Sequence, residues 1–302
     1  MTTDNPLGRV ATWAVLAMLA ANFLFSVVDG SSKWLLGLGY AALQLAFFRY
    51  FSQFTLTSVL MLIRGAGGLR QATPLMPKLI LRATLLVSST ICNFIALKYL
   101  SLTVTSAIMF SSPVLVCALS WPLLGEKVGS YRWVAVAFGF AGVLVVIRPF
   151  GADLNAAAFL MVAAALGLAL YSIMTRKLAA DVAPLTMQFV LGLTGTLVLA
   201  PFAWAYWVPP AGLGHLALML SLGCFAWFGH ELLIRAHQVA EANYLMPYSY
   251  SYLIYMSVLG YLLFGDLPDR WTVLGAIMIS VSGLVIWWRE LGQARARAAG
   301  RA

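Results

Sequence analysis

The stretch Tyr131-Arg-Trp-Val-Ala-Val-Ala-Phe-Gly-Phe-Ala-Gly-Val-Leu-Val-Val-Ile-Arg148 carries no charge between its two arginines. A helix needs about 20 apolar residues to cross roughly 30 Å of hydrocarbon, so this stretch predicts a membrane span. Only helices satisfy their own backbone polar groups in such surroundings. Similar runs recur along the chain and predict an all-α integral membrane protein with ten transmembrane helices, at 10–29, 41–63, 79–98, 102–124, 131–148, 156–175, 185–206, 214–234, 242–264 and 271–288.

The composition supports this fold class. Of the 302 residues, 62% are hydrophobic and 10% are charged, whereas soluble chains average roughly 45–50% apolar and about 25% charged residues. The ten spans leave no room for a soluble domain, so a nucleic-acid-binding module is excluded despite the net charge of +9. Cys92, Cys117 and Cys224 lie in apolar runs at wide spacing and predict neither disulfides nor a metal site. We expect no cofactor and no metal.

The positive charges orient the spans. If the N-terminus is cytoplasmic, 14 of the 19 lysines and arginines, Arg82 among them, fall on the cytoplasmic side. The other side carries only five: Lys33, Arg49, Lys98, Arg148 and Arg270. Positively charged loops stay in the cytoplasm. The chain is therefore predicted to be a multi-pass protein of the bacterial cytoplasmic (inner) membrane with both termini cytoplasmic.

A repeated pattern divides the chain into two halves. Leu124-Gly125-Glu126 followed by Arg132-Trp133 is echoed by Phe264-Gly265-Asp266 followed by Arg270-Trp271. The separation corresponds to five spans, and an odd number of spans inserts the two copies in opposite orientations, as in many secondary transporters. We therefore predict two inverted five-helix repeats around a central cavity, at 10–148 and 156–289, and a disordered basic cytoplasmic tail at 290–302.

These motifs also carry a family resemblance. Together with Ala96-Leu97-Lys98-Tyr99-Leu100, Ser111-Ser112-Pro113 and Leu124-Gly125-Glu126-Lys127, they make the whole chain resemble the EamA family of the drug/metabolite transporter superfamily. The resemblance implies a ten-helix basket with a central cavity. Relatives export amino acids or take up S-adenosylmethionine or riboflavin, so the resemblance implies transport of a small metabolite without specifying which one.

Arg49 is the leading candidate for substrate binding. It lies about 13 Å into the second span at 1.5 Å per residue, flanked by aromatic residues. A charged side chain at that depth is costly and is usually functional. We expect the guanidinium to bind a substrate carboxylate or phosphate. The alternative is a structural arginine that reaches the membrane surface or backbone carbonyls.

The first span carries a polar stripe of Asn22, Ser26, Asp29 and Lys33. At 100° per residue these positions fall within roughly 60° of arc, so they share one face. That face is predicted to line a cavity, with Asn22, Ser26 and Asp29 binding substrate, or to pack on another helix. Asp29 and Lys33 have the spacing of an ion pair, and Asp29 is the nearest candidate for proton coupling.

The remaining candidates come from later spans. Tyr248, Tyr252 and Tyr255 share one face of the ninth span and are predicted to contact substrate, with plain helix packing as the alternative. Asn93 and Ser112 are further cavity candidates. His230 and Glu231 are candidates for gating or proton coupling, although Glu231 also has the spacing of an ion pair with Arg235. Glu126 and Asp266 are interpreted as turn or cap residues.

The sequence therefore predicts a secondary transporter of a small polar or zwitterionic metabolite that works by alternating access. The alternatives are a lipid-linked flippase and a lipid-group transferase. The three histidines form no metal or nucleophile cluster, which disfavours an enzyme. A small-residue face at Ala135, Gly139 and Gly142 predicts either a close helix contact or a homodimer interface. The expected partners are thus a small-molecule substrate, the lipid bilayer and, as one use of that face, a second copy.

Overall fold

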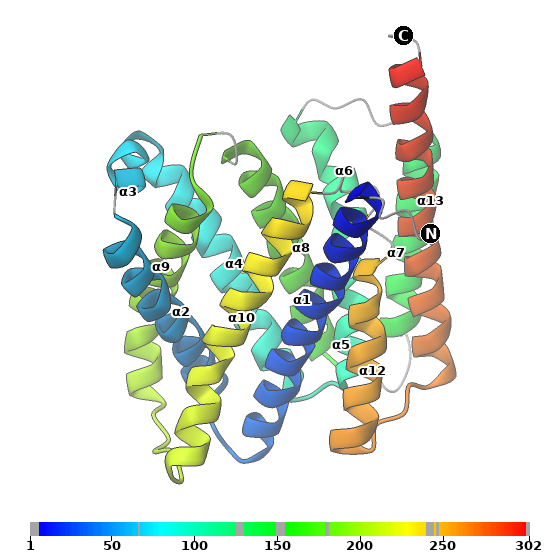
Figure 1. Ribbon diagram of the computed structural model, residues 1–302. Helices are drawn as coiled ribbons and strands as arrows, with labels where there is room; N and C mark the ends of the chain where they lie inside the picture. Colours follow the sequence, from blue (N-terminus) through cyan, green and yellow to red (C-terminus); the bar gives the residue numbers. More distant parts are fainter. Residues whose placement is uncertain are drawn as a thin grey trace, which may run out of the picture.

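The computed structural model describes residues 6–65, 67–124, 130–148, 155–178, 181–239, 245 and 248–299. These residues form helices joined by short turns, and no strand occurs among them. The helices run side by side as one bundle, with the α1–α2 and α12–α13 connections at the same end (Figure 1). Their bounds are α1 Pro6–Gly37, α2 Ala42–Arg64, α3 Gly67–Gln71, a 3-10 turn Thr73–Leu75, α4 Met76–Leu97, α5 Leu102–Met109, α6 Ser112–Leu124, α7 Ser130–Ile147, α8 Ala157–Leu178, α9 Pro184–Ala205, α10 Leu213–Val239, α12 Ser251–Phe264 and α13 Arg270–Ala299.

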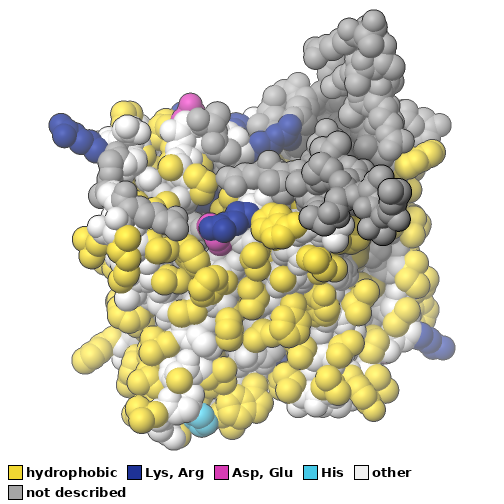
Figure 2. Space-filling model, in the orientation of Figure 1, with side chains coloured by type: hydrophobic (Ala, Val, Ile, Leu, Met, Phe, Trp, Pro, Cys, Tyr) yellow, Lys and Arg dark blue, Asp and Glu magenta, His cyan; other side chains and the backbone are white. Residues whose placement is uncertain are grey.

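The outside of the bundle has the character of a membrane-facing surface. Within the described chain, eight helical stretches are long and apolar enough to cross a bilayer, and two shorter apolar helices, Trp133–Ile147 and Ser251–Phe264, accompany them. Figure 2 shows a face covered largely by hydrophobic side chains, with few charged ones. The prediction of an all-α, multi-pass integral membrane protein is confirmed.

Two helix ends differ from the sequence prediction. The first span was expected to end at residue 29, but α1 continues to Gly37. Polar residues beyond residue 29 do not end the helix, because their side chains find partners within the protein: Ser32 bonds to the carbonyl of Val28, and Lys33 to that of Leu100. The predicted disordered tail is also wrong for the residues described, since α13 runs on to Ala299. The described segment after Arg289 contains four alanines and two arginines, which are strong helix formers.

Two predicted spans are interrupted. The expected span 102–124 is divided into α5 and α6, with a break between Met109 and Ser112. Pro113 has no backbone N–H to donate to the carbonyl of Met109, so the helix cannot continue regularly through this point. In the expected span 242–264, α12 begins only at Ser251. Residues 242–244 and 246–247 lie outside the described residues.

The two halves of the chain are interleaved rather than placed side by side as separate domains. The four most extensive helix contacts are α2 with α9, α1 with α10, α7 with α13, and α4 with α8. Each of these contacts joins a helix that precedes residue 148 to one that follows residue 155. The interior of the bundle is therefore built almost entirely between the halves.

Small residues allow the closest of these contacts. On α7 and α13, Gly142 and Gly275 face each other, and a Cβ added to Gly275 would lie 2.6 Å from the carbonyl oxygen of Gly142. Nearby, Ser282 donates a hydrogen bond of 2.6 Å from its hydroxyl to the carbonyl of Ala135. The predicted small-residue face of the fifth span is thus used for a helix contact inside the chain.

This contact predicts a steric effect at one glycine. Gly275→Ala should lower the free energy of unfolding by about 1–3 kcal/mol, because the added methyl group overpacks the α7–α13 contact. Thermal unfolding of the detergent-solubilised protein measures the change. Gly214→Ala is the matched control, since no atom lies within 4 Å of a Cβ added there. Equal stability of the two variants would contradict this account of the interface.

Candidate functional site

A buried carboxylate joins three helices in the interior. Asp29 of α1 is only 8% exposed. Its Oδ1 accepts a hydrogen bond of 3.1 Å from Asn93 Nδ2 on α4, and its Oδ2 accepts one from the hydroxyl of Tyr252 on α12. Both donors are neutral, so the structure satisfies Asp29 by hydrogen bonding without a salt bridge among the described residues. A carboxylate held in this way remains able to bind a cation or a proton.

A guanidinium group lies close to this carboxylate. Arg49 of α2 donates from Nη1 to the hydroxyl of Thr90 on α4, at 2.9 Å. The same hydroxyl is hydrogen-bonded to Tyr50 at 2.7 Å. The Nε of Arg49 is buried without a hydrogen-bond partner among the described residues. Because an unmade bond to a buried charged group is costly, this N–H favours an acceptor supplied by a ligand.

Helix α4 sets the spacing of the two charges. Thr90, which contacts Arg49, and Asn93, which contacts Asp29, are three residues apart, or about 4.5 Å along the helix axis. No hydrogen bond or ion pair joins Arg49 to Asp29 among the described residues. Their hydrogen-bond partners thus lie about one helical turn apart on α4, so a group that can bind an anion and a group that can bind a cation are held by the same helix, as a small zwitterion requires.

The other two candidates of the α1 stripe have structural contacts. Asn22 donates to the carbonyl of Tyr248 at 3.2 Å and to the hydroxyl of Ser251 at 3.1 Å. These bonds support the start of α12, where the backbone is irregular. Ser26 donates to the carbonyl of Phe23 in its own helix. Asp29 and Arg49 with their partners Asn93, Tyr252 and Thr90 are called the charged cluster below. The hydroxyl of Ser26 and the amide of Asn22 bond elsewhere and do not belong to it.

The predicted ion pair between Asp29 and Lys33 is wrong. Lys33 instead donates to the carbonyl of Leu100 at 2.6 Å and lies 3.7 Å from the carboxylate of Asp266. It also lies over the ring of Phe264. The intrahelical pair is replaced because Asp29 faces α4 and α12, whereas Lys33 faces the α4–α5 and α12–α13 turns. Asp266, which was interpreted as a turn residue, therefore also links the α12–α13 turn to α1; Glu126 lies outside the described residues.

The three tyrosines predicted to share a face separate in space. Only Tyr252 reaches Asp29. Tyr255 packs edge-on against Phe23, at 5.6 Å between ring centroids, and Phe23 is 48% exposed on the outside of the bundle. Tyr248 packs against the small buried cluster around Ala14. The prediction assumed one continuous helix, whereas a turn at Tyr250 separates Tyr248 from α12. Tyr252 and Tyr255 are both on α12 but contact different neighbours.

The two gating candidates, Glu231 and His230, and the cavity candidate Ser112 make contacts outside the charged cluster. Glu231 forms the intrahelical ion pair with Arg235, at 2.9 Å, that its spacing predicted. His230 packs its ring against Phe25, at 4.9 Å between centroids. Ser112 is buried at the first residue of α6, where the helix restarts. None of these three joins the charged cluster by a contact among the described residues.

Sequence reasoning missed one buried charge. Arg82 of α4 is 4% exposed, although it was counted with the arginines that determine orientation. It lies only three residues inside the predicted third span, so its position resembled that of a loop anchor. The structure shows how deep Arg82 lies. Because α4 begins at Met76, Arg82 is about 9 Å inside the helix.

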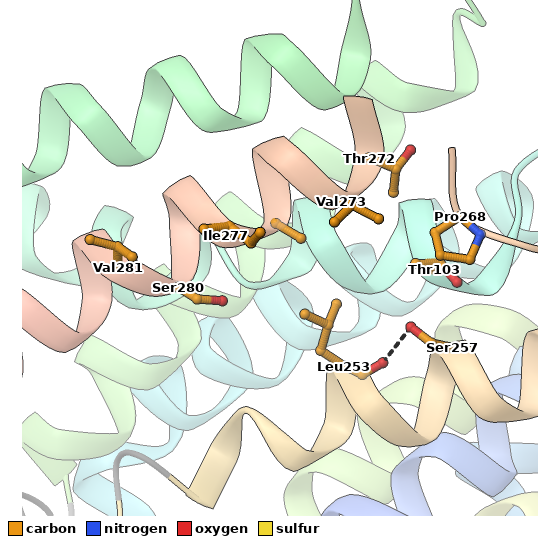
Figure 3. A pocket seen from close by; sticks show the side chains of 10 residues that line it. Thr103, Leu253, Ser257, Pro268, Thr272, Val273, Ile277, Ser280 and Val281 are labelled. Atoms are coloured by element: carbon orange, nitrogen blue, oxygen red, sulfur yellow. Dashed lines mark hydrogen bonds between the residues drawn. The ribbon is translucent and has the colours of Figure 1, made fainter. Parts of the chain in front are cut away.

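A groove on the bundle lies apart from the charged cluster. It has a volume of about 260 Å³ and is lined by residues of α5, α12 and α13 and of the turn between the last two. Val273, Ile277 and Val281 on its wall are each more than 40% exposed. Figure 3 shows its lining to be mostly apolar, with Ser257 hydrogen-bonded to Leu253. The groove contains none of the predicted site residues and suits apolar matter rather than a charged solute.

Comparison with known proteins decides the family. The sequence profile of the EamA-like transporter family matches residues 12–148 and again residues 155–288. The chain belongs to the EamA-like transporter family. It is accordingly a membrane transporter rather than an enzyme, which confirms the sequence prediction and sets aside the lipid-group transferase.

Individual relatives of this EamA-like chain are named for their solutes. The S-adenosylmethionine uptake transporter of Rickettsia prowazekii (strain Madrid E) is 27% identical over 278 residues, covering 92% of each chain. The riboflavin transporter of Vibrio cholerae serotype O1 is 33% identical over 187 residues, covering 60% of this chain and 61% of the relative. A solved crystal structure, 18% identical, covers 90% of this chain and 96% of its own with a TM-score of 0.61, which shows the same fold.

The start of α13 gives a test of a contact between the halves of this EamA-like chain. Asp269 Oδ1 accepts a hydrogen bond of 2.7 Å from the backbone N–H of Thr272, and Oδ2 contacts Arg148 at 2.5 Å. Partial burial raises the pKa of Asp269, but the bonds from Thr272 and the charge of Arg148 outweigh it and lower this pKa. The stability that these contacts of the Asp269 carboxylate give to the folded protein is therefore present at neutral pH. It is lost as the pH falls through the lowered pKa.

Two substitutions separate the cap from the ion pair. Asp269→Ala should lower the free energy of unfolding by about 1 kcal/mol through loss of the helix cap. Asp269→Asn keeps a capping oxygen and should cost less, while removing the acid-dependent part of the stability. Thermal unfolding between pH 3 and 7 measures both effects. If Asp269→Asn kept the pH dependence of the wild-type stability, that dependence could not come from the carboxylate of Asp269.

Proposed function

We propose that this chain carries a small zwitterionic organic metabolite across the bacterial cytoplasmic membrane by alternating access, and that Arg49 and Asp29 bind its opposite charges. One observation carries the proposal. Helix α4 places the hydrogen-bond partners of the two charges, Thr90 and Asn93, one turn apart in the interior. A solute with a carboxylate and a cationic group a few ångströms apart would satisfy both ends of this arrangement.

The unmade bonds indicate where the substrate groups would bind. The buried Nε of Arg49 has no acceptor in the part of the chain that the structure describes, and an incoming carboxylate would supply a charge-assisted one. The carboxylate of Asp29 has room for about four hydrogen bonds and accepts two from described side chains. A substrate ammonium or sulfonium group would bring the missing positive charge. S-Adenosylmethionine contains both a carboxylate and cationic groups. It and riboflavin are the first solutes to test, because relatives are named for them.

The contacts between helices support the proposal of ten spans in two inverted repeats. If α1, α2, α4 and α7 correspond to α8, α9, α10 and α13, exchanging the halves turns the α1–α10 contact into the α8–α4 contact. The α2–α9 and α7–α13 contacts each map onto themselves. The four main contacts thus form a set that the exchange leaves unchanged. Two inverted repeats can give a transporter two related conformations, each open to a different side of the membrane.

Transport by purified protein in proteoliposomes tests the function. Wild-type protein should take up labelled S-adenosylmethionine, the zwitterion of the two solutes, saturably. For the zwitterion, Arg49→Gln and Asp29→Asn should each weaken the apparent affinity by about 10- to 100-fold, because each removes a charged hydrogen bond. Arg70→Gln, which removes an exposed arginine on α3, is the control for lost charge. Wild-type affinity in a folded Arg49→Gln protein would refute the site.

The proposed orientation has an independent test. In a background without native cysteines, Leu267→Cys lies in the exposed turn between α12 and α13, and Gln71→Cys lies at the exposed end of α3. A membrane-impermeant maleimide should label residue 267 in intact spheroplasts and residue 71 only after permeabilisation, because the positive-inside bias places α3 in the cytoplasm. Labelling in the opposite order would reverse the topology.

A further inference from the structure

Arg82 makes an unusual set of contacts for a buried charge. Its Nε donates to the hydroxyl of Thr175 at 2.6 Å, and its Nη2 donates to the hydroxyl of Tyr171 at 2.6 Å. A third, longer bond of 3.4 Å joins Nη1 to the carbonyl of Met187. All three acceptors are neutral. Thr175 and Tyr171 belong to α8 and Met187 to α9, so every partner comes from the other half of the chain.

The geometry of the first two bonds resembles that of a bound anion. The Nε–H and one Nη2–H form one edge of the guanidinium plane, and a carboxylate or phosphate binds this edge through two oxygens. In Arg82 the two hydroxyl oxygens of Thr175 and Tyr171 occupy these two positions. Because a hydroxyl carries no charge, each is a weaker acceptor than the anionic oxygen that could replace it.

Arg82 has no counter-ion among the described residues, although its Cζ lies 4.3 Å from the ring centroid of Tyr171 in a cation–π contact. Burying a guanidinium without a counter-ion is costly, and no acidic side chain is paired with Arg82 in the described part of the chain. A neutral side chain could donate to the same hydroxyls at a lower desolvation cost. Ionisable groups that persist within a membrane bundle are usually functional.

Arg82 also belongs to the same helix face as the proposed site. At 100° per residue, Arg82, Thr90 and Asn93 fall within about 80° of one another on α4. Thr90 lies about 12 Å further along the axis than Arg82.

We propose that Arg82 is a second anion-binding group, which takes an oxyanion of the substrate near the N-terminal end of α4 and passes it to Arg49. This step rests on the proposed transport function. Movement of α8 relative to α4 opens the guanidinium edge, and the substrate oxygens then replace the hydroxyls of Thr175 and Tyr171. The occupant is a solute rather than a lipid headgroup, because Arg82 is enclosed by α4, α8 and α9.

Sulfate binding to the detergent-purified protein tests this assignment without assuming a transported solute. Binding is followed as the rise in unfolding temperature when sulfate replaces chloride at constant ionic strength. In Arg49→Gln, which leaves Arg82 as the interior anion site, sulfate should still stabilise the protein. In Arg49→Gln/Arg82→Gln the response should disappear, with an apparent Kd at least about tenfold weaker. The double variant Arg49→Gln/Arg70→Gln is the matched control and should respond like Arg49→Gln.

A second variant keeps the test decisive if removal of Arg82 prevents folding. Tyr171→Phe removes one hydroxyl that competes for the guanidinium edge, so it should bind sulfate several-fold more tightly than the wild type. A purely structural Arg82 predicts a lower unfolding temperature with unchanged sulfate affinity. No sulfate response in Arg49→Gln, or an equal response after loss of Arg82, would overturn the inference. Failure of all solutes in proteoliposomes would instead refute the proposed function and leave the sulfate result standing.

Discussion

The interior of this protein depends on one constraint: a polar side chain between membrane helices must find its partner within the protein, because hydrocarbon supplies no water. For the buried charges, helix α4 supplies many of these partners. Asn93 donates to Asp29 of α1, Thr90 accepts from Arg49 of α2, and Arg82 reaches α8 and α9. A single helix thus fixes the relative positions of the buried charges and of the helices that carry them.

The same constraint explains why the two halves interleave. Close approach of α7 and α13 requires glycines at the contact, and the remaining main contacts also cross from one half to the other. Relative movement of the halves would therefore change the bonds of Arg82 to α8 and α9 and the bond of Asp29 to Tyr252. The two ion pairs of the α12–α13 turn, formed by Asp266 with Lys33 and by Asp269 with Arg148, also join the halves.

Much of the architecture could be predicted from the sequence. Long apolar runs indicated a multi-pass helical membrane protein, and the repeated Gly-acidic and Arg-Trp motifs indicated the family. Predictions failed where regular helices were extrapolated: Pro113 divides one span, and the turn at Tyr250 separates Tyr248 from α12, which carries Tyr252 and Tyr255. Periodicity assigns faces only while a helix remains continuous, and on α12 itself Tyr252 bonds to Asp29 whereas Tyr255 packs on Phe23.

The sequence by itself determined the environment of the chain, because hydropathy and run length depend only on composition along the chain. It also singled out Arg49 and Asp29, since a charge within an apolar run is visible without a structure. The choice of partners belonged to tertiary structure. Asp29 and Lys33 lie one turn apart on α1, yet Asp29 binds Asn93 and Tyr252 while Lys33 binds Leu100 and Asp266. Partners come from segments that are distant in sequence, so only the packing of the helices decides between an intrahelical ion pair and contacts across the bundle.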